Sequence, residues 1–309
     1  MAEPLHDDLS AFDAAMLDAM SAPAPTDVTG APAPDGEAGD KKAKREIDWQ
    51  AFNAIANDFV LIYGTTTLFH RPTRRIMTTQ AAALTVSRFE YRIWLDSTRK
   101  AMVYPEDVVF DPTGMADSDD TKCNLFEPLA SVPTAGDVGP WLLLLDWLIG
   151  DSTTTKDEED TLRHWLLCWL AYPIQSLGSK HRSALIFHGD EGAGKNLLFD
   201  CYAEIYGKYA ATVGQDELED KFNDWRSCKL FVIGDEVVTA QEMGHTKNRL
   251  KALVTSPTVQ INPKGLPRRE EKNYMNVAFL SNELKPLKLD QTDRRYVVIW
   301  TPPKRERAF

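Results

Sequence analysis

A glycine-rich loop that ends in a lysine constrains this chain more than any other feature. Residues 184–196 read Ala-Leu-Ile-Phe-His-Gly-Asp-Glu-Gly-Ala-Gly-Lys-Asn, so Gly189, Gly194 and Lys195 match the pattern G-x-x-x-x-G-K. In such a loop successive backbone N–H groups point inward and hold a phosphate at the start of a helix. We therefore predict a buried strand before the loop and a helix over Asn196–Tyr206 after it.

The residue types of this loop suit a nucleoside triphosphate. Lys195 adds a positive charge for the β- and γ-phosphates, and ATP is the nucleotide that we expect. Asn196 stands where Ser or Thr normally contacts Mg²⁺, so we expect Asn196 to ligate the metal or a metal-bound water with altered affinity. The alternative is an ordinary glycine-rich turn before a lysine. The residues assigned to nucleotide binding are Gly189, Asp190, Glu191, Gly192, Ala193, Gly194, Lys195 and Asn196.

A second apolar run, residues 229–236, ends in two carboxylates and reads Lys-Leu-Phe-Val-Ile-Gly-Asp-Glu. A buried strand that delivers two acids at its carboxyl end is what a phosphate-loop ATPase requires beside the loop. We assign Asp235 to the Mg²⁺ shell. Glu236 would orient and deprotonate the attacking water, because hydrolysis depends on positioning and charge neutralisation. Alone this strand is a weak signal, and with the loop it is a strong one.

Two further strands complete the predicted catalytic set. Met275–Leu280 is followed by Asn282, which we expect beside the acidic strand, within reach of the γ-phosphate or the water. Arg294 and Arg295 precede a last strand at Tyr296–Trp300. An arginine just before an edge strand is well placed to reach the γ-phosphate bound by a neighbouring subunit. The alternatives are a turn-forming asparagine and surface charges in a turn.

Strands and helices alternate from Ser183 onward, which predicts an α/β domain built on a parallel sheet with helices on both faces. The carboxyl ends of such strands carry the site. The predicted strands lie near 184–188, 229–234, 275–281 and 295–300, and the predicted helices near 195–206 and 242–254.

The chain divides into four parts by composition. Residues 1–46 are rich in Ala, Pro and acidic residues and are predicted to be a disordered tail. Residues 47–180 form a mixed, mainly helical domain, 181–302 the ATPase domain, and 303–309 a basic tail. Within the second part we expect helices at Trp49–Tyr63, Thr78–Phe89 and Asp157–Ala171, the last stopped by Pro173, an extended Val103–Phe110, and core positions for Trp141, Trp147, Trp165 and Trp169.

Charge is distributed unevenly along the chain. The net charge is −11, yet residues 241–309 hold 14 basic and 7 acidic side chains. A basic loop around a Pro/Gly turn can track the phosphates of single-stranded DNA without reading sequence. We assign this DNA contact to Lys264, Arg268, Arg269 and Lys272.

Cysteine usage and hydropathy indicate the compartment. The four cysteines form no C-x-x-C pair, and we expect reduced core thiols of a cytoplasmic protein. The most apolar run, 141–149, is interrupted by Asp146 and is too short to span a bilayer. We therefore expect a protein with no membrane partner.

The order of these motifs resembles that of superfamily 3 helicases, in particular the primase–helicase ATPases of phages, plasmids and poxviruses. The resemblance covers Pro105–Trp300. It includes residues 221–225 (Lys-Phe-Asn-Asp-Trp) before the acidic strand and residues 262–265 (Asn-Pro-Lys-Gly) after it. It implies a P-loop, AAA+-like ATPase with ATP and Mg²⁺ as cofactors.

In those helicases the segment that 262–265 resembles is a hairpin whose lysine grips single-stranded DNA in the pore of a ring. The resemblance gives that role to Lys264, a sensor role to Asn282, and the arginine finger to Arg294 or Arg295. It further implies a homo-hexamer that acts in phage or plasmid replication. No primase motif is recognisable in the N-terminal part, so we expect a separate primase or polymerase as a partner, or priming that has been lost. Two alternatives remain: an ATPase that remodels or loads replication proteins without unwinding, and a nucleotide-dependent scaffold.

Overall fold

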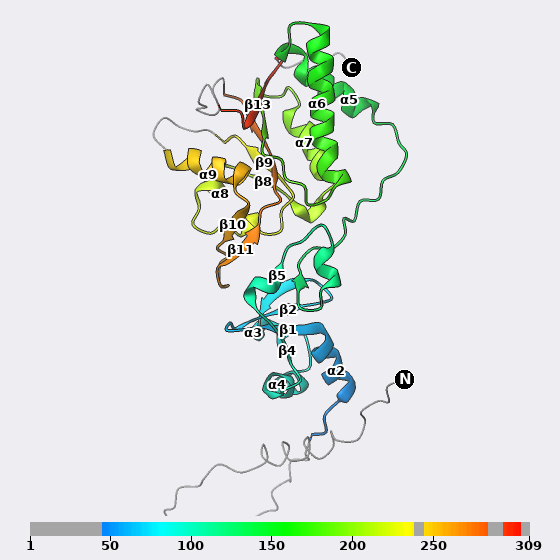
Figure 1. The fold of residues 1–309 in the computed structure, drawn as a ribbon, viewed down its shortest axis with the longest axis vertical. Helices are drawn as coiled ribbons and strands as arrows, with labels where there is room; N and C mark the ends of the chain where they lie inside the picture. The colour runs from blue at the N-terminus through cyan, green and yellow to red at the C-terminus, as the bar shows by residue number, and fades with distance from the viewer. Residues whose placement is uncertain (1–44, 238–243, 284–292, 304–309) are drawn as a thin grey trace, which may run out of the picture. The chain divides into compact units, whose positions relative to one another are not determined.

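The structure is a computed structural model that describes residues 45–237, 244–283 and 293–303 (Figure 1). From Ile47 onward the chain forms one compact unit. The two predicted tails, 1–46 and 303–309, lie almost wholly outside the described residues and stay predictions.

The first part of the unit contains a mixed four-stranded sheet that the sequence did not predict. Its order is β3-β2-β1-β4, in which β4 pairs parallel to β1 and the other pairs are antiparallel. Helices α2 and α4 pack against each other and share a core with Phe59 and Leu68 of the sheet. The elements are α2 (Trp49–Asp58), β1 (Phe59–Ile62), β2 (Thr67–His70), β3 (Arg75–Thr78), α3 (Thr79–Ala82), α4 (Arg88–Asp96) and β4 (Ala101–Val103).

Two predicted helices are therefore wrong in extent. The helix predicted at Trp49–Tyr63 ends at Asp58, because the next four residues alternate between two buried surfaces and enter the sheet as β1. The helix predicted at Thr78–Phe89 is only the single turn α3, in which the Ala81 N–H donates to the Thr78 hydroxyl as an N-cap. A new helix, α4, then starts at Arg88.

The middle of the chain connects this sheet to the main one. The predicted extended segment 103–110 is present, with a short 3₁₀ turn between β4 and β5. Helix α6 begins with a capping box between Thr155 and Glu158. The elements are η1 (Pro105–Asp107), β5 (Val108–Val109), η2 (Met115–Ser118), β6 (Cys123–Asn124), α5 (Gly139–Ile149), η3 (Gly150–Ser152) and α6 (Lys156–Gln175).

Pro173 does not stop α6, contrary to the sequence prediction. A proline lacks the N–H that would bond the carbonyl four residues earlier, here that of Trp169. The ring Nε2 of His181 lies 2.9 Å from this oxygen, and the two rings stack with centroids 4.7 Å apart. The freed carbonyl therefore has a replacement partner, and the helix continues to Gln175.

The main sheet has five parallel strands in the order β13-β7-β12-β9-β8. The four strands predicted there are confirmed, and β8 was missed. The elements are β7 (Ala184–Gly189), α7 (Lys195–Ala203), η4 (Gly207–Tyr209), β8 (Ala210–Val213), α8 (Gln215–Glu219), η5 (Asp224–Arg226), β9 (Phe231–Asp235), α9 (Gly244–Thr255), β10 (Thr258–Ile261), β11 (Arg269–Lys272), β12 (Asn276–Ser281) and β13 (Tyr296–Thr301).

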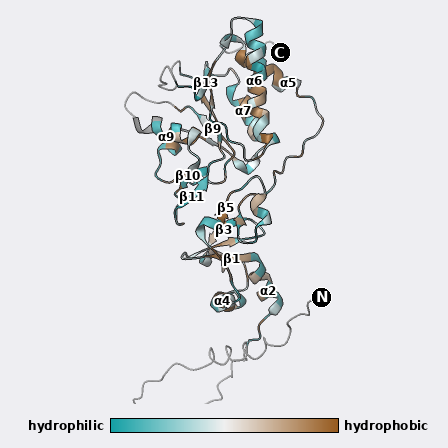
Figure 2. Ribbon diagram, in the orientation of Figure 1, coloured by the Kyte–Doolittle hydropathy of each residue, from teal (hydrophilic) through white to brown (hydrophobic). Residues whose placement is uncertain are grey.

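Alternate residues of the sheet face two separate cores. Leu185 and Phe187 share a core with α5, α6 and α7, whereas Ala184 and Ile186 share one with α8 and α9. Figure 1 shows these two groups of helices on opposite faces of the sheet. Figure 2 shows hydrophobic residues along α5 and hydrophilic residues in the first turns of α6. The α/β class with a parallel sheet is therefore as predicted.

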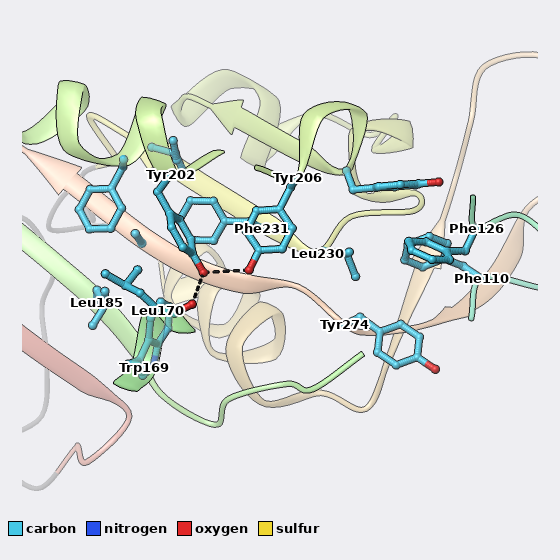
Figure 3. Packing of buried hydrophobic residues seen from close by; sticks show 14 of the residues in the cluster. Phe110, Phe126, Trp169, Leu170, Leu185, Tyr202, Tyr206, Leu230, Phe231 and Tyr274 are labelled. Carbon is cyan, nitrogen blue, oxygen red and sulfur yellow. Dashed lines mark hydrogen bonds between the residues drawn. The ribbon is translucent and has the colours of Figure 1, made fainter. Parts of the chain in front are cut away.

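Aromatic side chains fill the core beneath α7 (Figure 3). The Tyr202 hydroxyl donates to the Leu170 carbonyl at 2.7 Å and lies 2.8 Å from the Tyr206 hydroxyl. Both rings pack against Phe231 of β9. The satisfied hydroxyls let two tyrosines be buried without unpaired polar atoms, which fixes α7 against α6 and the sheet.

Some predicted core residues are exposed. Trp169 is buried and Trp141 and Trp147 are partly buried, but Trp165 is 38% exposed because the buried stripe of α6 runs through Leu166, Trp169 and Pro173. Cys168 and Cys201 are also exposed, on the outer faces of their helices, so the expectation of core thiols is wrong for them; all four cysteines are free.

Lys180 is buried against α9 and the segment before β12, and its burial can be tested. Its Nζ donates to the carbonyls of Met275 at 2.6 Å and Leu253 at 3.1 Å, and burial lowers its pKa from 10.5 to about 7. Between these two pH values the unfolded chain binds a proton that the folded chain does not, so stability rises with pH. We expect urea denaturation to give a larger free energy of unfolding at about pH 9 than at about pH 7.

This increase should be smaller in Lys180→Met and unchanged in Lys156→Met, whose lysine is 69% exposed. An equal increase in wild type and Lys180→Met would show that other groups produce it.

Candidate functional site

The loop after β7 needs glycine at two positions for steric reasons. Gly189 has φ 144°, and a Cβ there would lie 2.3 Å from the Thr301 hydroxyl and 2.6 Å from the Thr301 carbonyl oxygen. Gly194 has φ 105° at the N-cap of α7, and its Cβ would lie 2.9 Å from Leu144. Side chains are excluded at both ends of the loop, so its backbone follows the curled path that the sequence predicted.

Lys195 is the first residue of α7 and is 3% exposed. Its Nζ donates to the carbonyls of Gly189 at 2.9 Å and Asp190 at 2.7 Å, inside the curl of the loop. Burial lowers its pKa, against the charges of Asp190 and Asp235. Within the described residues it forms no ion pair. A buried ammonium whose hydrogen-bond partners are both neutral carbonyls, at a helix N-terminus, attracts an anion.

The residues between Gly189 and Gly194 differ in their exposure. Ala193 is buried, whereas Asp190, Glu191 and Gly192 are exposed. The exposed stretch leaves the backbone of the loop accessible from outside. A phosphate group therefore has access to the N–H groups that such a loop presents.

The strand register brings three carboxyl ends together. Leu280 of β12 pairs with Asp235 of β9, and Ser281 pairs with His188 of β7. Asp235 and the residues that follow β12 therefore lie beside the loop. This is the convergence that the sequence predicted for Asp235, Glu236 and Asn282.

Two amide–carboxylate contacts cross between these elements. Asn196 Nδ2 lies 3.0 Å from Asp235 Oδ2, and Asn282 Nδ2 lies 3.2 Å from Glu236 Oε1. Each acid is held by an asparagine from another element. The side chain of Asn196 thus contacts the acid that was expected to share its metal.

Glu236 has an unusual backbone conformation. Its φ is 51°, in the left-handed region that costs a non-glycine residue about 1 kcal/mol or more. Its N–H donates to the Leu280 carbonyl at 3.0 Å, which fixes the turn after β9. Strain of this kind clusters at functional sites, where it aims a side chain.

The donor set fits Mg²⁺ in the form that accompanies a nucleotide. Mg²⁺ uses one or two carboxylates, with waters and substrate phosphates as its other ligands. Asp235 supplies one carboxylate, and the side-chain oxygen of Asn196, which contacts Asp235 through its amide nitrogen, is a further oxygen ligand beside it. The described residues contain no group of three or more His, Cys, Asp or Glu side chains that could hold a metal. The phosphates would have to complete the coordination.

Two residues near the loop were missed by the sequence reasoning. Asp200 lies one helical turn after Asn196 on α7, and burial together with the charge of Asp235 raises its pKa. The i, i+4 spacing from Asn196 could have indicated it. His188 is buried, its Nδ1 has no partner among the described residues, and burial lowers its pKa. The position of His188 within an otherwise apolar strand could have indicated it from the sequence.

The two arginines lie at the amino ends of the parallel strands, opposite to the carboxyl ends that carry the loop. β13 runs parallel to β7, with Tyr296 beside Ala184 and Thr301 beside Gly189. Arg294 and Arg295 therefore lie near the start of β7, roughly 15–20 Å from the loop of their own chain at 3.3 Å per residue. Arg295 is half-buried and its Nε donates to Asp293 at 2.7 Å, whereas Arg294 is exposed.

The basic hairpin is formed by β10 and β11. Lys264 and Lys272 are exposed. Arg268 is also exposed, and its Nε donates to Asn262 at 2.9 Å. Arg269 is half-buried, and its guanidinium contacts the buried Glu271 at 2.7 Å and the Ser227 hydroxyl at 2.6 Å.

Comparison with known proteins places the loop and the acidic strand within a recognised family segment. Residues 187–295 match the model of a family of unknown function, DUF5906. The chain is similar to a DNA primase-polymerase of Nitratiruptor phage NrS-1, with 34% identity over 134 residues. These residues are 42% of this chain and 18% of the relative, so the match spans less than a fifth of that protein.

Solved structures of an NrS-1 C-terminal region share the fold. One apo structure of the C-terminal region of NrS-1 aligns with a TM-score of 0.64 and 22% identity, covering 81% of this chain and 61% of that one. Another gives a TM-score of 0.63 at 23% identity, with 82% and 61% covered. In the part of the chain that the structure describes, no helix is both long enough and apolar enough to cross a membrane.

Proposed function

We propose that this chain is an ATPase with a P-loop, AAA+-like fold that acts as a superfamily 3-type DNA helicase in phage or plasmid replication. The observation that carries the proposal is the buried Lys195 ammonium, curled into its loop without an ion pair among the described residues, beside Asp235 and Glu236. The printed name of the similar phage protein, a DNA primase-polymerase, supports a role in replication.

The residues divide the work of hydrolysis as follows. The loop N–H groups and Lys195 bind the phosphates of ATP, and Asp235 with Asn196 holds Mg²⁺, which neutralises phosphate charge when bound. Glu236, oriented by Asn282, takes the proton of the attacking water. Positioning and electrostatic stabilisation supply most of the acceleration in phosphoryl transfer.

Single-stranded DNA is the nucleic acid on which we propose that the protein translocates. Lys264 lies exposed in the loop of the β10–β11 hairpin, before Gly265, whose φ is 77°. A ring of six copies would present six such lysines to one strand, and the sequence-independent attraction to phosphates would be sensitive to salt. A separate primase or polymerase would act with it in the cytoplasm of the host.

One observation favours the alternative of an ATPase that remodels or loads other proteins without unwinding. Arg268 and Arg269 have partners within the hairpin, and the Lys272 ammonium lies 5.0 Å from the centre of the Tyr274 ring. Among the described residues, this leaves Lys264 as the predicted DNA contact without a hydrogen bond or ion pair. That basic surface is smaller than the sequence alone predicted.

The test is ATPase activity measured with and without single-stranded DNA, together with strand displacement. We expect single-stranded DNA to stimulate the ATPase activity of wild type, and we expect Lys264→Ala to lose this stimulation. The ATPase activity of the variant without DNA should be unchanged, because Lys264 belongs to the β10–β11 hairpin and not to the loop after β7. The salt dependence of DNA binding should fall by about one unit of slope per lost phosphate contact.

Lys156→Ala, at the exposed start of α6, is the matched control and should behave as wild type. Stimulation by DNA without strand displacement would favour the remodelling ATPase. Absence of ATP binding in wild type would refute both.

A further inference from the structure

The segment between α8 and β9 holds the first strand of the β10–β11 hairpin. The side chain of Asn223 donates from Nδ2 to the Gln260 carbonyl at 2.9 Å and accepts from the Asn262 N–H at 2.6 Å. Asn262 in turn donates from Nδ2 to the Lys221 carbonyl at 2.9 Å. We call residues 221–228 the anchor segment. These contacts fix the end of β10 to the anchor segment, just before the loop of the hairpin.

A buried carboxylate on β11 holds the second strand of the hairpin. Glu271 is 4% exposed. The Ser227 hydroxyl donates to Glu271 Oε1 at 2.7 Å, and the Cys228 N–H donates to Oε2 at 2.9 Å. The Arg269 guanidinium pairs with the same carboxylate at 2.7 Å and donates to the Ser227 hydroxyl at 2.6 Å. Both carboxylate oxygens therefore have donors from the anchor segment, and removal of a partner would leave a buried charge without compensation.

Cys228 ends the anchor segment in a left-handed backbone conformation. Its φ is 56°, a value that a residue with a side chain rarely adopts. Such a conformation persists where the surrounding contacts determine it, and here the N–H that it orients donates to Glu271. The strand β9 begins shortly afterwards, at Phe231. The turn that leads into the acidic strand is therefore shaped by a contact with the hairpin.

The same hairpin is connected to two strands of the candidate site. β11 continues through residues 273–275 into β12, and Glu271 contacts the segment that precedes β9. β9 and β12 are paired along the whole length of β9. At their carboxyl ends, Asn282 Nδ2 lies 3.2 Å from Glu236 Oε1. The two strands are therefore joined at one end by the hairpin contact and at the other by residues of the candidate site.

We propose that Arg269 and Glu271 are positioning residues that fix the hairpin to the anchor segment, and that DNA bound at Lys264 stimulates hydrolysis through this contact. The inference rests on the proposed ATPase function and deepens it, because it identifies the link between the DNA contact and the base Glu236. A displacement of the hairpin by DNA is passed by Glu271 to the amino ends of β9 and β12. The pairing of these strands carries it to the Asn282–Glu236 contact.

The contacts of Arg269 give it a different role from that of Lys264. The Arg269 side chain is 19% exposed, and its Nε and Nη2 both donate within the protein. A DNA phosphate could take this guanidinium only if Glu271 stayed buried without its cation, which is unfavourable. Lys264 is exposed. Arg269 therefore contributes to the stimulation by DNA and not to the salt dependence of DNA binding.

A comparison of Glu271→Gln with Glu270→Gln tests the contact. Both changes replace a carboxylate of β11 with an amide, but Glu270 is exposed and its carboxylate contacts Gln260 at 2.6 Å. ATP turnover is measured with and without oligo-dT. We expect turnover of Glu271→Gln to be the same in both conditions, because a neutral amide does not hold Arg269. Glu270→Gln should be stimulated as wild type is, and equal stimulation of Glu271→Gln would contradict the inference.

Arg269→Gln separates positioning from direct DNA contact. The affinity for fluorescently labelled oligo-dT is measured by anisotropy over a range of salt concentrations. We expect this variant to lose stimulation by oligo-dT and to keep the salt slope of wild type, whereas Lys264→Ala should lower the slope by about one unit. A slope lowered in Arg269→Gln by as much as in Lys264→Ala would show that Arg269 binds a phosphate, and would overturn the inference.

Ser227→Ala keeps the test decisive if circular dichroism shows that Glu271→Gln does not fold. This variant removes one hydroxyl and keeps both charges of the contact, so its stimulation by oligo-dT should be reduced without being lost. In that case, full stimulation of Ser227→Ala would overturn the inference.

Binding of a fluorescent ATP analogue separates this inference from the proposed function. We expect Glu271→Gln to bind the analogue as wild type does, because its phosphate loop is intact. If wild type binds the analogue and is stimulated by oligo-dT, equal stimulation of Glu271→Gln refutes only the link. If wild type does not bind the analogue, the proposed function fails and the inference fails with it.

Discussion

Replacing Glu236 with Gln is expected to lower ATP turnover about 10²–10⁴-fold, the range that a positioned general base contributes. A glutamine has the same shape, and its side-chain oxygen can still accept the contact that Asn282 Nδ2 makes with Glu236 at 3.2 Å. The variant therefore removes the proton acceptor and keeps the geometry. ATP binding should be unchanged, since phosphate contacts come from the loop and Lys195.

The measurement is steady-state phosphate release together with equilibrium binding of a fluorescent ATP analogue. Glu159→Gln, at the start of α6, is a control with the same chemical change on a helix surface away from the loop. Loss of both binding and turnover in Glu236→Gln would indicate a structural role for the strained turn. Unchanged turnover would mean that another group deprotonates the water.

The residues at the loop could be predicted from the sequence because each is marked by a local sequence signal. An apolar run that ends in a glycine-rich loop, or in two acids, marks both a strand and the end where its chemistry lies. β7 and β9 each carry such a signal. The meeting of Asn282 with Glu236 then follows from β12 lying between these two strands. Because these strands are parallel, their carboxyl ends lie at the same end of the sheet.

The errors arose where tertiary contacts overrode local preference. The residues after Asp58 have helical spacing but also alternate, and two buried surfaces select the strand. Pro173 stays inside α6, where His181, eight residues later, supplies a partner for the Trp169 carbonyl. The strands of four residues or fewer are too short for a period to be read reliably.

The position of the arginines could not be read from the sequence, because it depends on strand direction and register. The pairing of Tyr296 with Ala184 shows that Arg294 and Arg295 precede β13 at the amino end of the sheet, away from the loop. The same register places both arginines roughly 15–20 Å from the loop of their own chain, farther than an arginine side chain reaches. It also separates two neighbours that the sequence treats alike, since Arg295 is paired with Asp293 and Arg294 is exposed.

Arg294→Ala is accordingly expected to lower ATP turnover on the order of 10³-fold or more, the contribution of an arginine supplied by a neighbouring subunit. Arg295→Ala is the paired control, and we expect a much smaller loss because its guanidinium already holds Asp293 in the same chain. Wild-type turnover per subunit should fall on dilution, since assembly supplies the missing charge.

Mixing makes the test specific. Lys195→Ala lacks a working loop but keeps Arg294, whereas Arg294→Ala keeps its loop. Combining these two inactive variants should restore part of the activity, because the arginine of one can complete the loop of the other. A mixture as inactive as its components would contradict catalysis in trans. A larger loss in Arg295→Ala than in Arg294→Ala would mean that the Asp293 pair opens and that Arg295 is the finger.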